Sequence, residues 1–160
     1  MERPSPTRED PEPSPLPGIL GSGELLQGRF RLLEPIGRGG MGSVFRGRDE
    51  ELKRPVAIKV LALDSESARK RFTREAEVTA SIRHPGVIRI HAAGEIRAQP
   101  FLVYELIEGS KSLDDAFAER TVEERLDLLE QASAGVAEAH ALGIVHRDLK
   151  PDNVLVRPSG

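Results

Sequence analysis

Apolar and polar positions alternate along five stretches of the chain, and this alternation predicts five β-strands. The stretches are rich in β-branched and aromatic residues and are bounded by glycine, proline or charged residues, as strands usually are. They read FRLLEPI, SVFRGR, PVAIKVL, VIRIHAAGE and FLVYELI and cover residues 30–36, 43–48, 55–61, 87–95 and 101–107.

Helical periodicity replaces the alternation in three places. Residues 65–83 place four side chains on one stripe: Phe72, Ala76, Thr79 and Ile82. A short helix is expected to start at Ser112, and a longer one at Thr121, which forms a capping box with Glu124. One face of the longer helix continues through Leu126, Leu129, Val136 and Ala139, and Gly143 is a plausible end. Five strands with one inserted helix, followed by further helices, predict an α+β fold rather than a repeated βαβ unit.

The first 28 residues follow neither pattern. Six prolines lie before Gly18, with Ser, Glu and Arg between them. Such a stretch cannot bury enough apolar surface to offset its ordering entropy, so residues 1–28 are predicted to be a disordered tail. A docking peptide is the alternative, but the prolines alternate and never take PxxP spacing, which favours a solvated spacer.

Composition narrows the functional classes. A chain of 160 residues, 38% hydrophobic and 31% charged, suits one globular domain with a tail. The net charge of -3 favours neither nucleic acid nor an anionic membrane as partner. The absence of cysteine excludes disulfides and thiolate metal sites and fits a reducing compartment. No apolar stretch approaches the ~20 residues needed to span a bilayer and no signal peptide is recognisable, so a cytoplasmic location is expected.

A glycine-rich segment follows the first predicted strand. It matches the pattern G-x-G-x-x-G-x-V and reads Gly37-Arg38-Gly39-Gly40-Met41-Gly42-Ser43-Val44. Glycines let a backbone approach phosphate oxygens closely and present its N–H groups to them. Taken alone, the segment is equally compatible with a flexible hairpin turn. It also fits a dinucleotide-binding fingerprint, which requires the last glycine to open a helix and an acid about 20 residues later. Because Gly42 leads into a strand-like run and position 59 is lysine, strand–turn–strand is favoured over a Rossmann fold.

Two opposite charges lie on apolar faces of neighbouring elements. Side chains alternate along the third predicted strand, so Lys59 shares a face with Ala57 and Leu61. A lysine reaching solvent from an edge strand would explain this placement. Glu75 lies on the apolar stripe of the predicted helix, where a carboxylate is costly unless it is paired. We interpret the two as partners; the pair could be structural, but the glycine loop upstream favours a role in positioning phosphates.

A charged loop follows the long predicted helix and reads His146-Arg147-Asp148-Leu149-Lys150-Pro151-Asp152-Asn153. Asp148 could accept the proton of an attacking hydroxyl, and Lys150 could balance charge on a γ-phosphate. Asn153 could offer an oxygen to Mg²⁺. A charged surface turn is the alternative, and Pro151 does favour a turn, but this order of eight residues rarely occurs by chance.

Together these motifs resemble the eukaryotic-type protein kinase family, whose signatures include the glycine loop, V-A-I-K and H-R-D-L-x-x-x-N. The match covers about Arg29 to Gly160, and the wording G-G-M-G-S-V-F is similar to the bacterial Ser/Thr branch. Lysine two residues after Asp148 is the Ser/Thr form of the loop. The resemblance implies a protein-kinase-like α+β fold: a five-stranded antiparallel N-lobe sheet with one helix, followed by the first helices and catalytic loop of an incomplete C-lobe. It divides residues 29–160 into N-lobe (29–103), hinge (104–109) and the start of the C-lobe (110–160).

The resemblance also implies ATP and Mg²⁺ as cofactors and protein Ser/Thr hydroxyls as acceptors. In that pattern Lys59 contacts the α- and β-phosphates and pairs with Glu75, while Asp148 is the catalytic base. Asn153 holds one Mg²⁺. Adenine would be enclosed by four apolar side chains: Ile36, Val44, Ala57 and Leu155. The gatekeeper would be Tyr104, and the base would bond to the backbone of two hinge residues, Glu105 and Ile107.

One part of the family pattern does not appear. Neither D-F-G nor A-P-E follows Asn153 before Gly160. The aspartate of D-F-G is a principal Mg²⁺ ligand, so we expect an incomplete catalytic domain without measurable phosphotransfer of its own. The alternative is a nucleotide-binding or regulatory kinase-like fragment.

Overall fold

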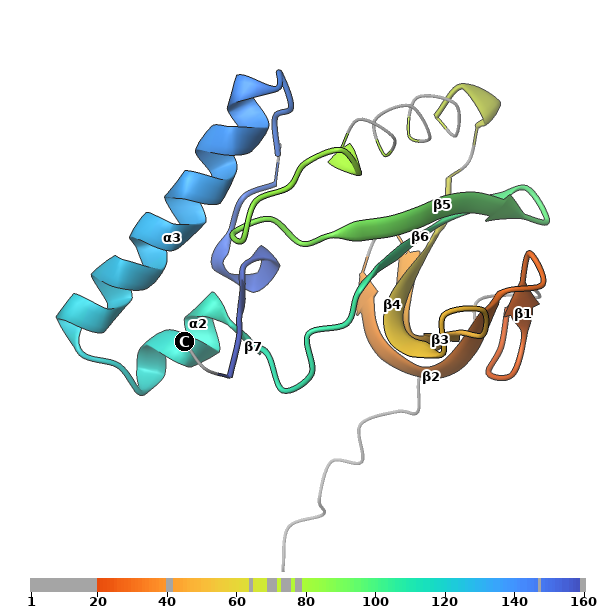
Figure 1. Cartoon of the computed structure of the whole chain (residues 1–160), viewed down its shortest axis with the longest axis horizontal. Helices are drawn as coiled ribbons and strands as arrows, with labels where there is room; N and C mark the ends of the chain where they lie inside the picture. The colour runs from red at the N-terminus through yellow and green to blue at the C-terminus, as the bar shows by residue number, and fades with distance from the viewer. Residues whose placement is uncertain are drawn as a thin grey trace, which may run out of the picture.

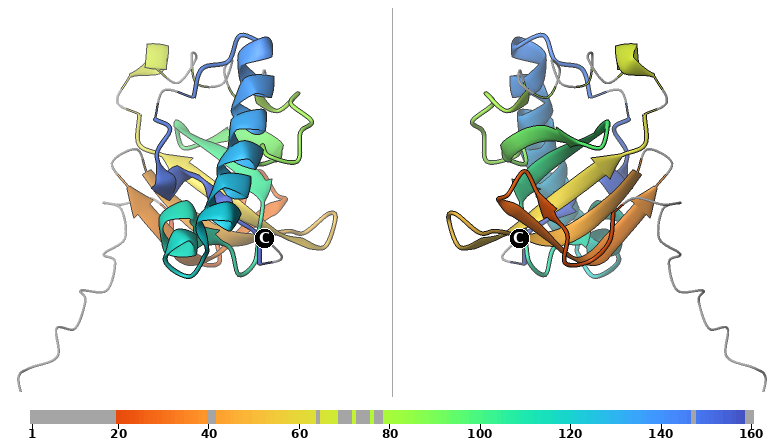
Figure 2. Two further views of the ribbon diagram at one scale, coloured as in Figure 1. Left: turned by 90° about the vertical axis from the view of Figure 1, so that its left-hand side faces the viewer. Right: turned by 90° about the vertical axis from the view of Figure 1, so that its right-hand side faces the viewer.

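The described part of the chain forms a curved antiparallel sheet with helices beside it. The structure is a computed structural model and describes residues 20–39, 42–63, 65–68, 72, 76, 79–146 and 148–158. Figure 1 shows the sheet at one side and α3 at the other, and the segment after α3 turns back toward the sheet. Figure 2 shows how strongly the sheet curves when it is seen from the end away from α3.

All five predicted strands are present, and a short sixth strand joins them. The strands are β1 (Leu25–Leu26), β2 (Phe30–Gly39), β3 (Gly42–Asp49), β4 (Arg54–Leu61), β5 (Ile90–Ile96) and β6 (Gln99–Glu105). Every neighbouring pair is antiparallel, in the order β1-β2-β3-β4-β6-β5. The expected five-stranded sheet therefore has six strands, because β1 pairs with the start of β2.

The helices begin and end where capping residues place them. The described residues of the stretch between β4 and β5 include helical positions 66–68, 72, 76 and 79. Helix α2 (Leu113–Ala118) is capped by the side chain of Ser112. Helix α3 (Val122–Ala141) carries the predicted Thr121–Glu124 capping box and ends before Gly143, whose φ is 75°.

Short elements complete the helical part. Strands β7 (Lys111–Ser112) and β8 (Leu155–Val156) pair with each other, and a 3₁₀ turn, η1 (Pro151–Asn153), precedes β8. A small core packs α2 against α3 and β8 through Leu113, Ala116, Leu128 and Val156. In the ranges that the structure describes, no helix combines the length and apolar character needed to cross a bilayer. The α+β prediction is confirmed.

The main core lies on one face of the sheet. Alternation along β4 buries every second side chain completely on this face: Val56, Ile58 and Val60. The rings of Phe30 and Phe101 meet edge to face here, with their centroids 6.3 Å apart. Burying one such side chain contributes about 1.5–3 kcal/mol before ordering entropy is counted, so this face dominates the stability of the sheet.

The N-terminal boundary of the folded part lies earlier than the sequence predicts. Leu20 and Leu26 are 4% and 0% exposed and belong to the main core. Residues 20–28 are therefore part of the folded unit, and the prediction of disorder to residue 28 is wrong for them. Leu20 and Leu26 lie between glycine and polar residues after the prolines and give no periodic signal. Residues 1–19 lie outside the described ranges.

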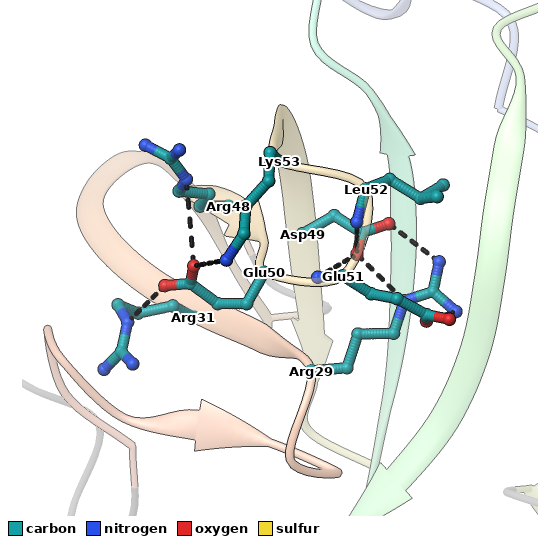
Figure 3. Close-up of polar contacts among 8 residues, drawn as sticks. All are labelled: Arg29, Arg31, Arg48, Asp49, Glu50, Glu51, Leu52 and Lys53. Atoms are coloured by element: carbon teal, nitrogen blue, oxygen red, sulfur yellow. Dashed lines mark hydrogen bonds and ion pairs between the residues drawn. The ribbon is translucent and has the colours of Figure 1, made fainter.

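A charged network fixes the turn between β3 and β4 (Figure 3). The side chain of Asp49 is completely buried and accepts hydrogen bonds from Arg29 Nε and Nη2 at 2.9 and 2.8 Å. The backbone N–H groups of Glu51 and Leu52 also donate to it, each at 3.2 Å. The bonds from Arg29 outweigh the effect of burial and lower the pKa of Asp49 to about 2. Next to it, Glu50 pairs with Arg31, Arg48 and Lys53.

Candidate active site

The glycine segment forms a hairpin between β2 and β3. Arg38 lies opposite Ser43 and Gly39 opposite Gly42; Gly40 and Met41 lie outside the described ranges. The preference for strand–turn–strand over a Rossmann turn is confirmed, because Gly42 starts a strand and not a helix.

Two glycines of this hairpin differ in what a side chain would meet. Gly42 has φ 142°, and a Cβ there would lie 2.0 Å from the carbonyl oxygen of Val60. At Gly37 a Cβ would meet only the Cβ of Val44, at 3.8 Å. The fold itself therefore requires glycine at position 42, whereas at position 37 glycine leaves room beside the backbone.

Lys59 lies on β4 in the interior of the sheet. Its cross-strand neighbours are Val44 on β3 and Leu102 on β6, so the edge-strand explanation is wrong. Lys59 is half-buried on the face opposite the main core. The predicted helix packs on this same face, since Ala76 is 4% exposed and clusters with Leu102. The expected partner Glu75 is adjacent to Ala76 in sequence but lies outside the described ranges, so the ion pair stays a prediction.

The residues predicted to enclose adenine come from four separate strands. Val44 and Ala57 share the face of Lys59, on β3 and β4. Ile36 on β2 and Leu155 on β8 are 51% and 46% exposed, which is high for large apolar side chains. Large apolar side chains that stay exposed on strands are typical of a ligand cleft.

A cavity of about 690 Å³ lies between the sheet, α3 and the segment after α3. Four predicted site residues are among its lining residues: Tyr104, Ile107, Asn153 and Leu155. Other predicted site residues in the described ranges, such as Gly37, Val44 and Lys59, are not. Burial raises the pKa of the Tyr104 hydroxyl to about 12, so this side chain remains neutral.

The hinge segment is the predicted hinge of residues 104–109. Its residue Glu105 ends β6 and is fixed by two hydrogen bonds with Arg89. The N–H of Glu105 donates to the carbonyl of Arg89 at 2.9 Å, and the N–H of Arg89 donates to the Glu105 carboxylate at 3.0 Å. The N–H of Glu105 is thus engaged by Arg89. Ile107 accepts from the N–H of Ser110 at 3.3 Å in a turn through Gly109, whose φ is 68°.

Arg157 also contacts the hinge segment. Its Nη2 lies 3.2 Å from Oε2 of Glu105. Burial alone would raise the pKa of Glu105, but the Arg89 N–H and the Arg157 guanidinium together lower it. Arg157 carries no signal in the sequence, because it belongs to no motif and its partner Glu105 lies 52 positions away.

The charged loop brings its three candidate catalytic residues together. Asn153 Nδ2 donates to the carbonyl oxygen of Asp148 at 2.7 Å and to its carboxylate Oδ2 at 2.9 Å. Lys150 Nζ lies 3.5 Å from the same Oδ2. The turn η1 makes these contacts possible, because it carries the chain back over the preceding residues. Arg147 lies outside the described ranges.

This arrangement suits a phosphate-bound Mg²⁺ ion better than an all-protein metal site. With Nδ2 of Asn153 bonded to Asp148, its Oδ1 points the other way and can serve as an oxygen ligand. Within the described ranges, no group of three or more His, Cys, Asp or Glu side chains could hold a metal. Mg²⁺ typically takes one or two protein oxygens and completes its shell with water and phosphate, which fits this donor set.

Known proteins are similar to this chain in sequence and fold. The sequence model of the family described as protein kinase domain matches residues 30–160. The chain is 44% identical over 140 residues to the serine/threonine-protein kinase pkn2 of Myxococcus xanthus, covering 84% of the chain and 17% of that protein. It is 39% identical over 148 residues to PknA of Mycobacterium tuberculosis, covering 86% of the chain and 34% of that protein.

A solved structure agrees. The crystal structure of the Mycobacterium tuberculosis PknI kinase domain superimposes with a TM-score of 0.75 at 27% identity, covering 88% of this chain and 59% of that one. The chain thus spans between a sixth and a third of the length of these two curated relatives.

Proposed function

The chain belongs to the protein kinase domain family, and we propose that it supplies the ATP-binding cleft and catalytic loop of a Ser/Thr protein kinase. The reaction transfers the γ-phosphate of ATP to Ser or Thr hydroxyls of a protein substrate. The observation that carries this proposal is the contact between Asp148, Asn153 and Lys150 in one short loop. The loop lies across the cavity from the sheet face that carries Tyr104.

Each loop residue has a distinct role in this proposal. Asp148 orients the acceptor hydroxyl and takes its proton at the carboxylate. Asn153 holds Asp148 through Nδ2 and offers Oδ1 to Mg²⁺. Lys150, beside the same carboxylate, balances charge on the transferred phosphate. A lysine two residues after the catalytic aspartate supports Ser/Thr rather than Tyr as acceptor.

The sheet binds the nucleotide. ATP supplies the phosphoryl group, and Mg²⁺ neutralises the charge that develops on it. The backbone of the glycine hairpin approaches the phosphates, and Lys59 extends from the same face toward them. The adenine ring lies between Val44 and Ala57 on one side and Leu155 on the other. Use of ATP and the lack of cysteine support a cytoplasmic location.

Nucleotide binding is tested first, by thermal unfolding of the chain with and without ATP and Mg²⁺. We expect ATP to raise the melting temperature and Lys59→Ala to remove that rise. Lys53→Ala, which removes an equal charge at the distant β3–β4 turn, is the matched control and should keep it. If wild-type chain shows no rise at millimolar ATP, the proposed cleft is wrong.

Phosphotransfer is tested with γ-labelled ATP and a generic protein substrate, followed by phosphoamino acid analysis. Phosphoserine or phosphothreonine that is lost in Asp148→Asn but kept in Asp152→Asn supports the assignment. Phosphotyrosine would contradict it. ATP binding without any transfer is the result expected for a chain without a D-F-G aspartate, and a nucleotide-binding kinase-like fragment would give the same result.

A further inference from the structure

The hinge segment is held by ion pairs to both walls of the cleft. We propose that Arg46 and Arg157 are positioning residues that fix this segment, and so set the width of the slot that receives the adenine ring. The inference rests on the proposed function, because it assigns both arginines to the same nucleotide site.

Arg46 connects the hinge segment to the sheet. It lies on β3 opposite Ala57 of β4, and it shares a face with Val44, two positions earlier on the strand. Its guanidinium bonds to Glu108 of the hinge segment and lies 3.5 Å from Glu34 of β2. Arg46 therefore joins the wall that carries two proposed adenine contacts to the segment whose backbone faces the base.

The strand geometry gives Arg46 this position. The register of β2 and β3 pairs Leu32 with Gly47 and Pro35 with Phe45, so Leu33 and Glu34 both lie opposite Arg46. Such a bulge bends the strand and re-aims side chains. Here it places the Glu34 carboxylate within ion-pair distance of Arg46, whose guanidinium is then held from two sides.

Arg157 connects the hinge segment to the opposite wall. It follows β8 directly, where Leu155 is exposed and Val156 is buried. Arg157, also exposed, points to the same side as Leu155 because side chains alternate. It pairs with Glu105, whose position is further fixed by the two bonds with Arg89.

The two ion pairs thus attach the hinge segment to both walls, one at each end. Glu108 is held by Arg46 from the sheet, and Glu105 by Arg157 from β8. Both pairs are partly exposed, so each should have a modest and salt-sensitive effect. Losing one pair frees one wall of the slot, and losing both leaves only the bonds between Glu105 and Arg89, the pairing of β6 with β4 and the covalent chain to set its width.

The test measures adenosine and ATP affinity by isothermal titration calorimetry of the full chain. We expect Arg46→Ala and Arg157→Ala each to weaken adenosine and ATP binding equally, by roughly threefold, and the double variant by roughly tenfold. Lys59→Ala should weaken ATP but not adenosine. Arg48→Ala, on the same strand and face as Arg46 but paired with Glu50, is the matched control and should bind as wild type.

Two further measurements separate positioning from a general loss of structure. The melting temperature without nucleotide should be the same for Arg46→Ala and Arg48→Ala. The combined reversal Arg46→Glu with Glu108→Arg should regain the nucleotide affinity that Arg46→Glu alone loses. In 1 M salt, where the Debye length is only about 3 Å, the difference in affinity between Arg46→Ala and wild type should shrink.

Two outcomes overturn different claims. Wild-type chain that binds neither adenosine nor ATP would overturn the proposed function, and this inference with it. Wild-type chain that binds both, with Arg46→Ala and Arg157→Ala indistinguishable from Arg48→Ala, would overturn the positioning role alone.

Discussion

Gly86 and Gly135 meet backbone to backbone: a Cβ at position 135 would lie 2.5 Å from the carbonyl oxygen of Gly86. Gly86 belongs to the turn before β5, and Gly135 is buried in the middle of α3. The turn is shaped by His84, whose Nδ1 accepts the N–H of Gly86 at 3.0 Å. The contact is therefore a direct link between the sheet and the long helix, and it leaves no room for a side chain.

Gly135→Ala should destabilise the protein although alanine is the better helix former. The helix gains up to about 1 kcal/mol from the substitution. A methyl group forced against the Gly86 carbonyl costs about 1–3 kcal/mol, because the backbone must move. We expect a lower melting temperature in thermal unfolding followed by circular dichroism. The control is Gly21→Ala, where a Cβ would have no neighbour within 4 Å; equal melting temperatures for the two variants would contradict the close contact.

Local patterns predicted most elements of this fold. The alternation of apolar and polar residues predicted the five strands and the face on which Lys59 lies, because strand pattern and side-chain direction depend only on neighbouring residues. The cap residues Ser112 and Thr121 placed the starts of α2 and α3, because a side chain there satisfies backbone groups within three positions.

Contacts between distant segments were not predictable from these patterns. Periodicity shows which side of an element is buried but not which element covers it. Gly86 and Gly135 each look like ordinary glycines in sequence, and Arg46 lies 62 positions from Glu108. The same limit applies in the candidate site. The order of Asp148, Lys150 and Asn153 predicted one loop, but only the structure shows the hydrogen bond from the Asn153 side chain that orients Asp148.

Two glycines of the hairpin should respond differently to alanine. Gly42→Ala places a Cβ 2.0 Å from the Val60 carbonyl and adopts φ 142°, so we expect a clearly lower melting temperature. Gly37→Ala meets only ordinary contact with Val44 and should keep the melting temperature while weakening ATP binding. The measurement is thermal unfolding of both variants with and without ATP. Equal destabilisation of Gly37→Ala and Gly42→Ala would contradict this distinction, because it would show that the fold requires glycine at both positions.

Asp49 should make stability depend on acid pH. Its pKa in the folded protein, about 2, lies below the ordinary value of 3.8, so its contribution is fully present above pH 4. That contribution, about 2 kcal/mol, is lost as pH falls from about 4 to about 2. Asp49→Asn should lower the free energy of unfolding by a similar amount at pH 7, measured by urea titration, and the difference should vanish near pH 2. Glu95→Gln, an exposed change on β5, is the control and should leave the whole curve unchanged.

The capping box of α3 should be worth about 1 kcal/mol. Thr121 Oγ1 accepts the N–H of Glu124 at 3.3 Å, and the Glu124 carboxylate accepts the N–H of Thr121 at 2.8 Å. Thr121→Ala removes one half of the box and should lower the free energy of unfolding in urea by that amount. Glu123→Ala, in the same turn but outside the box, should have a smaller effect. A larger loss in the Glu123 variant would show that charge in the first turn matters more than the cap.

Asn153 should couple Mg²⁺ to nucleotide binding without affecting the base site. Its Nδ2 holds Asp148 in place and its Oδ1 is directed away as a candidate ligand, so Asn153→Ala loses both functions at once. Removing a metal ligand or its support typically costs 10- to 100-fold in metal affinity. We therefore expect the gain in ATP affinity on adding Mg²⁺ to fall by about tenfold or more in calorimetric titration, while adenosine affinity stays unchanged. The neighbouring exposed Asp152→Ala is the control and should retain the full Mg²⁺ effect. If Asn153→Ala keeps that effect, Asn153 serves only to orient Asp148, and the metal must be held by other groups.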